Sequence, residues 1–504
     1  MPSRRHSPRW TFALVSAGGV MMTLDVTVVN VALPDIARDL ESGLGRVQWT
    51  VSAYSLAFGA LLLTAGALSD RLGRRAVFMA GMVLFTLASA ACGLAPDAGT
   101  LIAARAAQGL GGAMVFAPTL ALIAAAYEGA RRQAAIASYA LVASAAGALG
   151  PIVGGVFVET LGWRWIFLVN VPIGVLVVAG ALTRMPESAA PGDPGRRVDV
   201  PGAVLAVGFL LALHYPLVTG PEAGWTAPEV LGSAAACAVL AVALVIGQRR
   251  GGGLIDISLL RIRALSGAAA LGFLARLSSL GVLAFLTLWL QSTHAYSPLR
   301  TGLLLLPLTG SLLVAGLFVN RLQQAYAPDV LVAGGFAAQG FGLLALAAAG
   351  AGAGGAAMVT GLVLLGVGGA VIFPPLMGVA VGTVPAERAG MASGLTNACY
   401  PLGTATGVAV FGAVFSVRLD GGLGTGPAGA APLREAVETG RFDLLAPALR
   451  PLARSAFSGA FTAVCLAAAL VCLLGVVAAR TLRPVPAPAD ARAKRPRARA
   501  PQPS

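Results

Sequence analysis

A single acidic residue stands inside a long apolar stretch near the N-terminus of this 504-residue chain. Residues 21–34 read MMTLDVTVVNVALP, with Asp25 as the charged residue among them. Two further charges, Arg105 and Arg276, lie inside other apolar runs. A charge at the centre of a bilayer costs about 3 kcal/mol to insert, so it needs a partner or a path to water. Asp25 therefore either neutralises Arg105 and orders two helices, or loads and releases a proton as water reaches it from alternate sides.

The composition indicates that these charges lie in a membrane. Hydrophobic residues make up 57% of the chain and charged residues 11%, and the mean hydropathy is +0.82. That leaves too little polar surface to cover a water-soluble protein of this length. The net charge of +14 would favour nucleic acid as the partner of a soluble protein. Here the basic residues lie in short gaps between apolar runs, which favours the lipid bilayer as partner and no nucleic acid.

Apolar runs long enough to cross roughly 30 Å of hydrocarbon define the predicted spans. Fourteen such runs occur, at 11–33, 49–68, 76–94, 101–125, 134–158, 164–182, 199–218, 230–247, 265–290, 301–319, 330–349, 356–380, 394–416 and 456–479. When the loops are assigned to alternate sides, one side collects most of the 35 basic residues. Both termini are therefore predicted to be cytoplasmic.

An internal repeat divides the chain. Residues 109–118 read GLGGAMVFAP and residues 366–375 read GVGGAVIFPP, identical at six of ten positions. Shorter matches recur at nearly the same offset, which predicts two related six-helix halves. The predicted domains are an N-terminal six-helix bundle at 1–185, two inserted transmembrane helices at 186–250, a C-terminal six-helix bundle at 251–480, and a disordered basic cytoplasmic tail at 481–504. The repeat counterparts of Arg105 and Gln108 are Leu362 and Leu365. The second half therefore forms the same fold without these two polar side chains.

Several chemistries are excluded by the residues present. Lys494 is the only lysine of the chain, so there is no Walker A lysine and no ATP hydrolysis to drive transport. The five cysteines and three histidines are scattered without metal-ligand spacing. We therefore expect no metal, no cofactor, no catalytic residues and no enzymatic activity.

Two further motifs stand at the ends of predicted spans. Residues 66–75 read GALSDRLGRR, between the second and third spans. They are either a turn with arginines that set topology, or a latch in which Asp70 caps a helix N-terminus or pairs with an arginine. Residues 147–155 read GALGPIVGG, in the fifth span. This motif predicts either dense packing alone or a kink with a tight helix crossing.

Together these motifs resemble those of the major facilitator superfamily. GALSDRLGRR resembles its loop signature, Arg105 with Gln108-Gly109 resembles its fourth-helix motif, and residues 147–155 resemble the fifth-helix motif of its antiporters. The stretches LDVTVVNVALP at 24–34 and WRWIFLVNVP at 163–172 are similar to the fourteen-helix drug:proton antiporters.

The resemblance implies an all-α membrane protein in which two pseudo-symmetric six-helix bundles are joined by two inserted helices, with fourteen spans in all. It implies that Asp25 and Arg105 lie close together and couple transport to protons. It implies a cytoplasmic gate made by Gly66, Asp70, Arg71, Gly73 and Arg74. It implies an antiporter motif made by Gly147, Gly150, Pro151, Gly154 and Gly155, in which Gly150, Pro151 and Gly154 let the fifth helix bend.

The expected function is proton-coupled export of lipophilic or cationic small molecules, such as drugs or antibiotics, by alternating access. The expected partners are a small-molecule substrate, protons and the bilayer of the bacterial cell membrane, with the monomer as the working unit. The alternative is an uptake carrier for a small metabolite on the same fold, which is expected to have a more polar cleft. Candidate substrate contacts are Gln108, Phe116, Phe273, Phe373 and Asn397.

Overall fold

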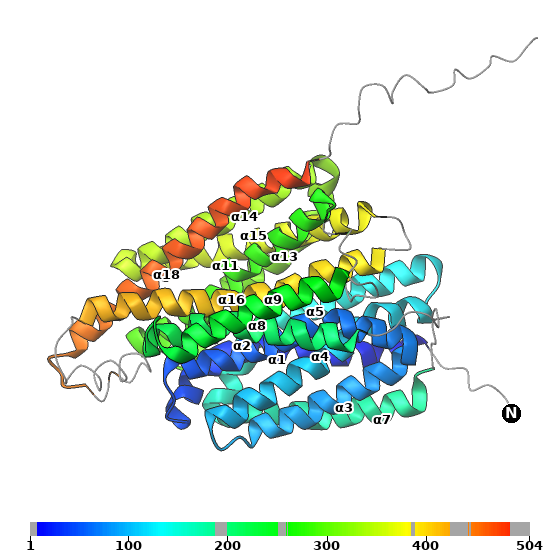
Figure 1. Cartoon of the computed structure of the whole chain (residues 1–504). Helices are drawn as coiled ribbons and strands as arrows, with labels where there is room; N and C mark the ends of the chain where they lie inside the picture. The colour runs from blue at the N-terminus through cyan, green and yellow to red at the C-terminus, as the bar shows by residue number, and fades with distance from the viewer. Residues whose placement is uncertain are drawn as a thin grey trace, which may run out of the picture.

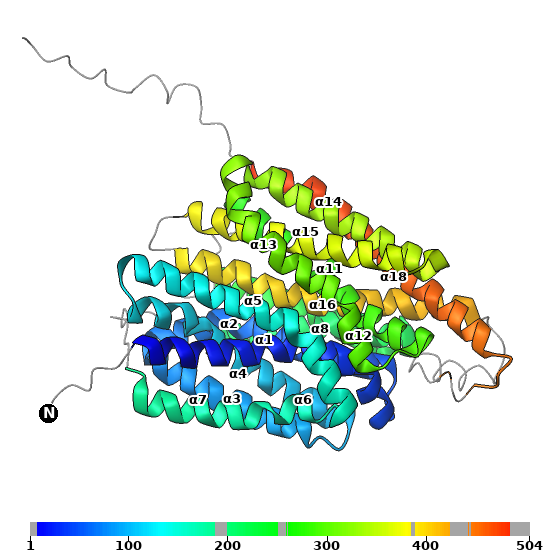
Figure 2. The same cartoon turned by 180° about the vertical axis from the view of Figure 1, so that it is seen from behind.

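The structure is a computed structural model that describes residues 8–186, 199–249, 259, 261–384, 389–423, 442 and 445–483. Every regular element in these ranges is a helix. The helices run side by side in one bundle, and the start of α1 and the end of α18 lie at the same end of it (Figures 1 and 2). The predictions of an all-α chain and of a polytopic membrane protein are confirmed.

The first half of the chain forms one group of helices. Its members are α1 (Pro8–Asp39), α2 (Leu44–Leu72), α3 (Arg74–Gly93), α4 (Ala98–Ala126), α5 (Gly129–Thr160), α6 (Trp165–Leu168) and α7 (Asn170–Arg184). α4 packs against both α2 and α3, and α1 packs against α5. This arrangement places α4 against α1 and α2, where Arg105 must find its partners.

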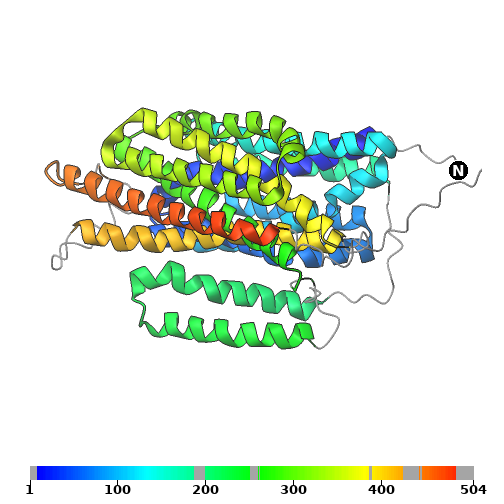
Figure 3. The same cartoon turned by 90° about the horizontal axis from the view of Figure 1, so that it is seen from above.

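A helical pair follows. α8 (Val200–Ala223) packs against α9 (Pro228–Arg249), and Figure 3 shows the pair as a separate layer below the other helices. α8 contacts α2 and α16. On α8, His214 is buried with its Nε2 3.1 Å from the hydroxyl oxygen of Thr406 on α16. One polar contact therefore ties this pair to the rest of the bundle.

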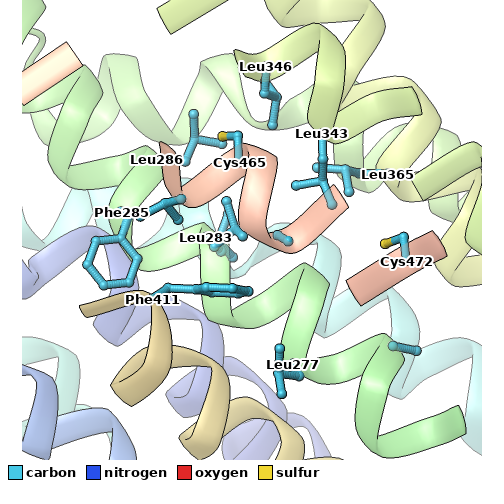
Figure 4. Close-up of a cluster of buried hydrophobic side chains, with 14 of the residues drawn as sticks. Leu277, Leu283, Phe285, Leu286, Leu343, Leu346, Leu365, Phe411, Cys465 and Cys472 are labelled. Atoms are coloured by element: carbon cyan, nitrogen blue, oxygen red, sulfur yellow. The ribbon is translucent and has the colours of Figure 1, made fainter. Parts of the chain in front are cut away.

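The second half repeats the first in outline. Its members are α11 (Arg263–His294), α12 (Pro298–Leu304), α13 (Leu306–Ala325), α14 (Pro328–Ala348), α15 (Gly355–Gly382), α16 (Ala389–Leu423) and α18 (Arg450–Ala478). Leu365, the counterpart of Gln108, lies in an apolar cluster with Leu343 and Cys465 (Figure 4). The position that is polar in the first half is thus part of the apolar core in the second.

Within the described residues, twelve helices are both long and apolar enough to cross a membrane. α2 and α5, of 29 and 32 residues, lie between them in the chain. Together these helices are compatible with fourteen spans and with termini on one side, and both statements stay predictions. The division at 185/186, 250/251 and 480/481 also stays a prediction, and most of the tail lies outside the described residues.

The GALSDRLGRR segment is more helical than its sequence suggests. A loop was expected between spans ending at 68 and starting at 76, but Gly73 alone separates α2 from α3. Its φ of 99° and ψ of 135° belong to a region that glycine reaches without a steric penalty. Asp70 and Arg71 therefore lie in the last turn of α2, and Arg74 begins α3. The extent of that predicted loop is wrong because glycine allows the turn to close within one residue.

Candidate functional site

The two charged residues of the first half meet in the interior. Asp25 on α1 is 3% exposed and Arg105 on α4 is 1% exposed. The Nη1 of Arg105 lies 2.5 Å from the Oδ2 of Asp25, in a buried ion pair. The resemblance implied that they lie together, and the structure places them so. Two charges at membrane depth are thus neutralised by each other, which removes most of the cost of inserting either alone.

Gln108 completes a closed triangle with this pair. Its Oε1 accepts from Arg105 Nη1 at 2.6 Å, and its Nε2 donates to Asp25 Oδ1 at 2.8 Å. The same Nε2 donates to the hydroxyl of Ser89 at 2.6 Å, and Asn170 Nδ2 donates to that hydroxyl at 3.2 Å. Both carboxylate oxygens of Asp25 therefore have a donor, each from a residue of α4.

The guanidinium of Arg105 is held from two further directions. Its Nε donates to the backbone carbonyl of Thr50 at 2.9 Å. Its Cζ lies 4.4 Å from the centre of the Tyr54 ring and 5.6 Å from that of Phe167. Such stacking stabilises a cation in a site that excludes water. These contacts hold the Arg105 side chain in place. A change in the charge of Asp25 therefore acts directly on α4, the helix that carries Arg105.

Sequence reasoning missed five of the members named above. They are Thr50 and Tyr54 on α2, Ser89 on α3, Phe167 on α6 and Asn170 on α7. Asn170 lay within the WRWIFLVNVP stretch, and Ser89 is a small polar residue inside an apolar run, so each carried a weak signal. Thr50 contributes through its backbone carbonyl, and no residue type predicts that.

The fifth-helix motif lies between helices of both halves. A Cβ on Gly150 would meet the side chain of Thr27 on α1, and one on Gly154 would lie 3.0 Å from Val28 Cγ1. A Cβ on Gly155 would lie 2.6 Å from the Cα of Leu299 on α12. α5 continues as a helix through Pro151. The motif therefore permits close approach of α5 to α1 and to α12.

Polar contacts join the two halves at the end of the bundle opposite the termini. Thr287 Oγ1 on α11 donates to the carbonyl of Asn30 at 2.8 Å, and Gln291 Nε2 donates to that of Val31 at 2.9 Å. Between α12 and α5, the backbone N–H of Leu299 donates to Glu159 Oε2 at 3.1 Å. We call these three hydrogen bonds, with the Gly155 to Leu299 contact, the seal.

The general sequence pattern of the Major Facilitator Superfamily matches residues 15–408. The chain is 37% identical over 415 residues to the multidrug resistance protein Stp of Mycobacterium tuberculosis, covering 82% of this chain and 77% of that one. It is 32% identical over 416 residues to the tetracenomycin C resistance and export protein of Streptomyces glaucescens, with the same two coverages.

The chain belongs to the Major Facilitator Superfamily. The chain is also 33% identical to the multidrug efflux pump LfrA of Mycolicibacterium smegmatis, over 86% of each chain. Its fold matches that of a bacterial homologue of the lysosomal transporter Spinster, solved inward-facing and unoccupied, with a TM-score of 0.66 at 16% identity over 96% of this chain and 100% of that one. It is thus a multi-pass transporter of the bacterial cell membrane that acts on small molecules.

In this superfamily member the predicted gate residues lie at the end of the bundle that holds the termini. Arg71 is exposed, and a Cβ on Gly66 would meet nothing within 4 Å. Next to Arg74, Arg75 donates from Nη2 to the carbonyl of Leu182 on α7 at 2.8 Å. The Asp70 side chain lies outside the described residues, so the latch stays a prediction.

The predicted substrate contacts separate into three places. Gln108 is fully buried in the Asp25 network. Phe116 packs edge-on against Phe58 at 5.8 Å between ring centres. On the other side, the partly exposed Phe373 packs against Tyr400 at 5.0 Å.

The remaining two candidates, Phe273 on α11 and Asn397 on α16, are partly exposed and belong to the helices that pack around Phe373. Phe273 packs against the apolar core of the second half. Asn397 lies one helical turn before Tyr400. The structure thus groups three of the five candidates in the second half and leaves their contact with substrate as a prediction.

Proposed function

We propose that this transporter exports drugs or antibiotics in exchange for protons, by alternating access. The observation that carries the proposal is the buried ion pair between Asp25 on α1 and Arg105 on α4. The other hydrogen bonds of the pair run to Gln108 and to the backbone of α2. A carboxylate that binds one proton loses its charge, and Arg105 then loses its counter-ion. Loading of a proton thereby changes the energy of the α1 to α4 contact.

The seal supports alternating access. It joins α1 to α11 and α5 to α12, which are helices of opposite halves. If the arginine-rich side is cytoplasmic, the sealed end is external, and the molecule is in the state that opens inward. A rocking motion of the halves would break these few hydrogen bonds and form others at the opposite end. Because one chain supplies both halves, the proposed working unit is the monomer.

The direction and driving force follow from the same elements. A proton that crosses inward, down an inside-negative potential of about 100 mV, releases roughly 2.3 kcal/mol. At about 1.4 kcal/mol per tenfold, this is enough to concentrate a neutral cargo about 50-fold. The names of the relatives, which include resistance and export proteins, support export over uptake. A puromycin resistance protein of Streptomyces alboniger, 34% identical over 424 residues, supplies a practical first test compound.

The test uses everted membrane vesicles energised by respiration, which have an acidic lumen. Addition of puromycin, or of another compound to which the protein gives resistance, is expected to release protons from the lumen and collapse part of the pH gradient. Vesicles with Asp25→Asn are expected to show no such collapse. Cargo accumulation that persists with a protonophore present would contradict proton coupling.

A further inference from the structure

The second half carries its own intramembrane arginine, Arg276. It lies 13 residues from the start of α11, near the middle of that 32-residue helix. Its Cζ lies 4.4 Å from the centre of the Phe373 ring on α15, and the phenol of Tyr400 on α16 is close enough to interact with it electrostatically. Arg276 is therefore directed among three helices of the second half, away from lipid.

The guanidinium of Arg276 lacks the partners that Arg105 has. Arg105 is bonded to a carboxylate, a side-chain amide and a backbone carbonyl. Among the residues that the structure describes, Arg276 has neither an acidic partner nor a hydrogen-bond acceptor, and Phe373 supplies only the face of its ring. A guanidinium has five N–H donors in a planar fork that matches a carboxylate, and here they are unused.

A second unused donor lies beside it. Within the described ranges, the hydroxyl of Tyr400 is buried without a hydrogen-bond partner. The first half offers a comparison in Tyr139 on α5, whose side chain lies against Gly19 of α1 as that of Tyr400 lies against Gly272 of α11.

There, however, the tyrosine hydroxyl is bonded to the side chain of Thr119. At the repeat offset of the fourth-helix motif, the counterpart of Thr119 is Leu376, which has no polar atom. Among the described residues, the Tyr400 hydroxyl thus lacks the side-chain partner that the Tyr139 hydroxyl has. An unpaired buried polar group is costly, which is expected where a ligand supplies the missing partner.

Arg276 also lies away from the seal, on the side of the end of the bundle that holds the termini. An α-helix rises 1.5 Å per residue, so Arg276 is about 16 Å from Thr287, toward the end of the bundle that holds the termini. Arg276, Phe373 and Tyr400 are all partly exposed although they face one another at membrane depth. Charged side chains inside a membrane face a water-filled interior when they lack a protein partner. In the inward-opening state of the proposed function, cargo that enters from the end holding the termini would reach this position.

We propose that Arg276, Tyr400 and Phe373 form a binding site for a flat aromatic compound that carries an acidic group, a carboxylate or an ionised phenol. The acidic group accepts from the Arg276 fork and from Tyr400, and the ring packs beside Phe373. That this ligand is the transported cargo rests on the proposed function, whereas the binding site itself does not. It narrows the expected substrate class, because an unpaired arginine repels a permanent cation.

Binding is measured on the purified full chain in lipid nanodiscs by calorimetry. The three probes share one ring and differ in charge: naphthalene-2-carboxylate, naphthalene-2-carboxamide and 2-naphthyltrimethylammonium. The carboxylate is expected to bind about 10- to 100-fold more tightly than the other two, the range of one or two charge-assisted hydrogen bonds. Arg276→Gln should abolish this preference, and Tyr400→Phe should reduce it severalfold.

Arg263→Gln is the matched control, because Arg263 is an exposed arginine at the start of the same helix and its loss changes the net charge equally. Equal affinity for the three probes, or a preference that survives Arg276→Gln, would overturn the inference. Arg276→Lys keeps the charge without the fork and guards against misfolding of the glutamine variant. It should bind the carboxylate with intermediate affinity.

The vesicle assay separates this inference from the proposed function. Proton-coupled movement of neutral or cationic compounds, unaffected by Arg276→Gln, would leave the proposed function standing and overturn this site. Binding of the carboxylate that depends on Arg276, without proton release by any compound, would support the site and contradict the proposed function.

Discussion

Asp25→Asn separates a proton carrier from a structural counter-ion. Asparagine keeps the size of the side chain but offers one acceptor oxygen where aspartate offers two, and it cannot titrate. In the structure, one oxygen of Asp25 accepts from Arg105 and the other from Gln108. The variant therefore loses one hydrogen bond and leaves the guanidinium without a counter-ion.

The energetic cost can be bounded from the burial. Asp25 and Arg105 are 3% and 1% exposed, so neither gains solvation when the pair is broken. Removal of one member of a buried ion pair costs about 3–5 kcal/mol. The double variant Asp25→Asn with Arg105→Gln removes the unpaired charge as well, and its thermal stability is expected to recover in large part. Asp35→Asn, on the same helix but in a more exposed pair with Arg38, is the matched control and should cost about 1 kcal/mol or less.

Transport then decides between the two roles. If Asp25 carries the proton, both the single and the double variant should bind cargo and exchange it, yet fail to concentrate it against a gradient in vesicles. Cargo affinity in the wild type should fall as the pair takes up a proton at low pH, and this dependence should vanish in both variants. Uphill export by the double variant with the wild-type pH profile would refute the coupling role and leave Asp25 as the neutraliser of Arg105.

Three other perturbations test the gates and the inserted helices. Gly155→Ala should force α5 away from α12 and open the seal, measured as faster thiol labelling of a cysteine placed at the seal. Gly147→Ala should change the labelling rate little, because its Cβ would meet only a threonine methyl group at 3.2 Å. Asp70→Asn should leave insertion and cargo binding intact and cut transport strongly, with Asn320→Ala milder, and equal losses would argue for a folding role. Thr406→Val removes the contact with the buried histidine of α8 and should cost about 0.5–1.5 kcal/mol in thermal stability with export unchanged.

The sequence by itself determined the class of the molecule and its two charged centres. Runs of apolar residues longer than the bilayer thickness predict spanning helices with little dependence on context, because unpaired backbone groups are so costly in lipid. The same physics makes Asp25, Arg105 and Arg276 conspicuous, since a charge among apolar residues needs a reason. The repeat at 109–118 and 366–375 predicted the two halves, and the motifs identified the superfamily.

The tertiary structure alone decided which faces of these helices meet. In water an amphipathic pattern shows which side of a helix is buried, but in a bilayer both the lipid-facing and the buried side are apolar, so the pattern gives little information on rotation. The sequence therefore did not predict that Gln108 belongs to the Asp25 network, or that Gly155 meets Leu299. It predicted Asp25 as the partner of Arg105 and no partner or role for Arg276. The packing of α1 against α4 brings Asp25 to Arg105, and the packing of α11 against α15 and α16 sets Arg276 against Phe373 with no acidic partner among the described residues.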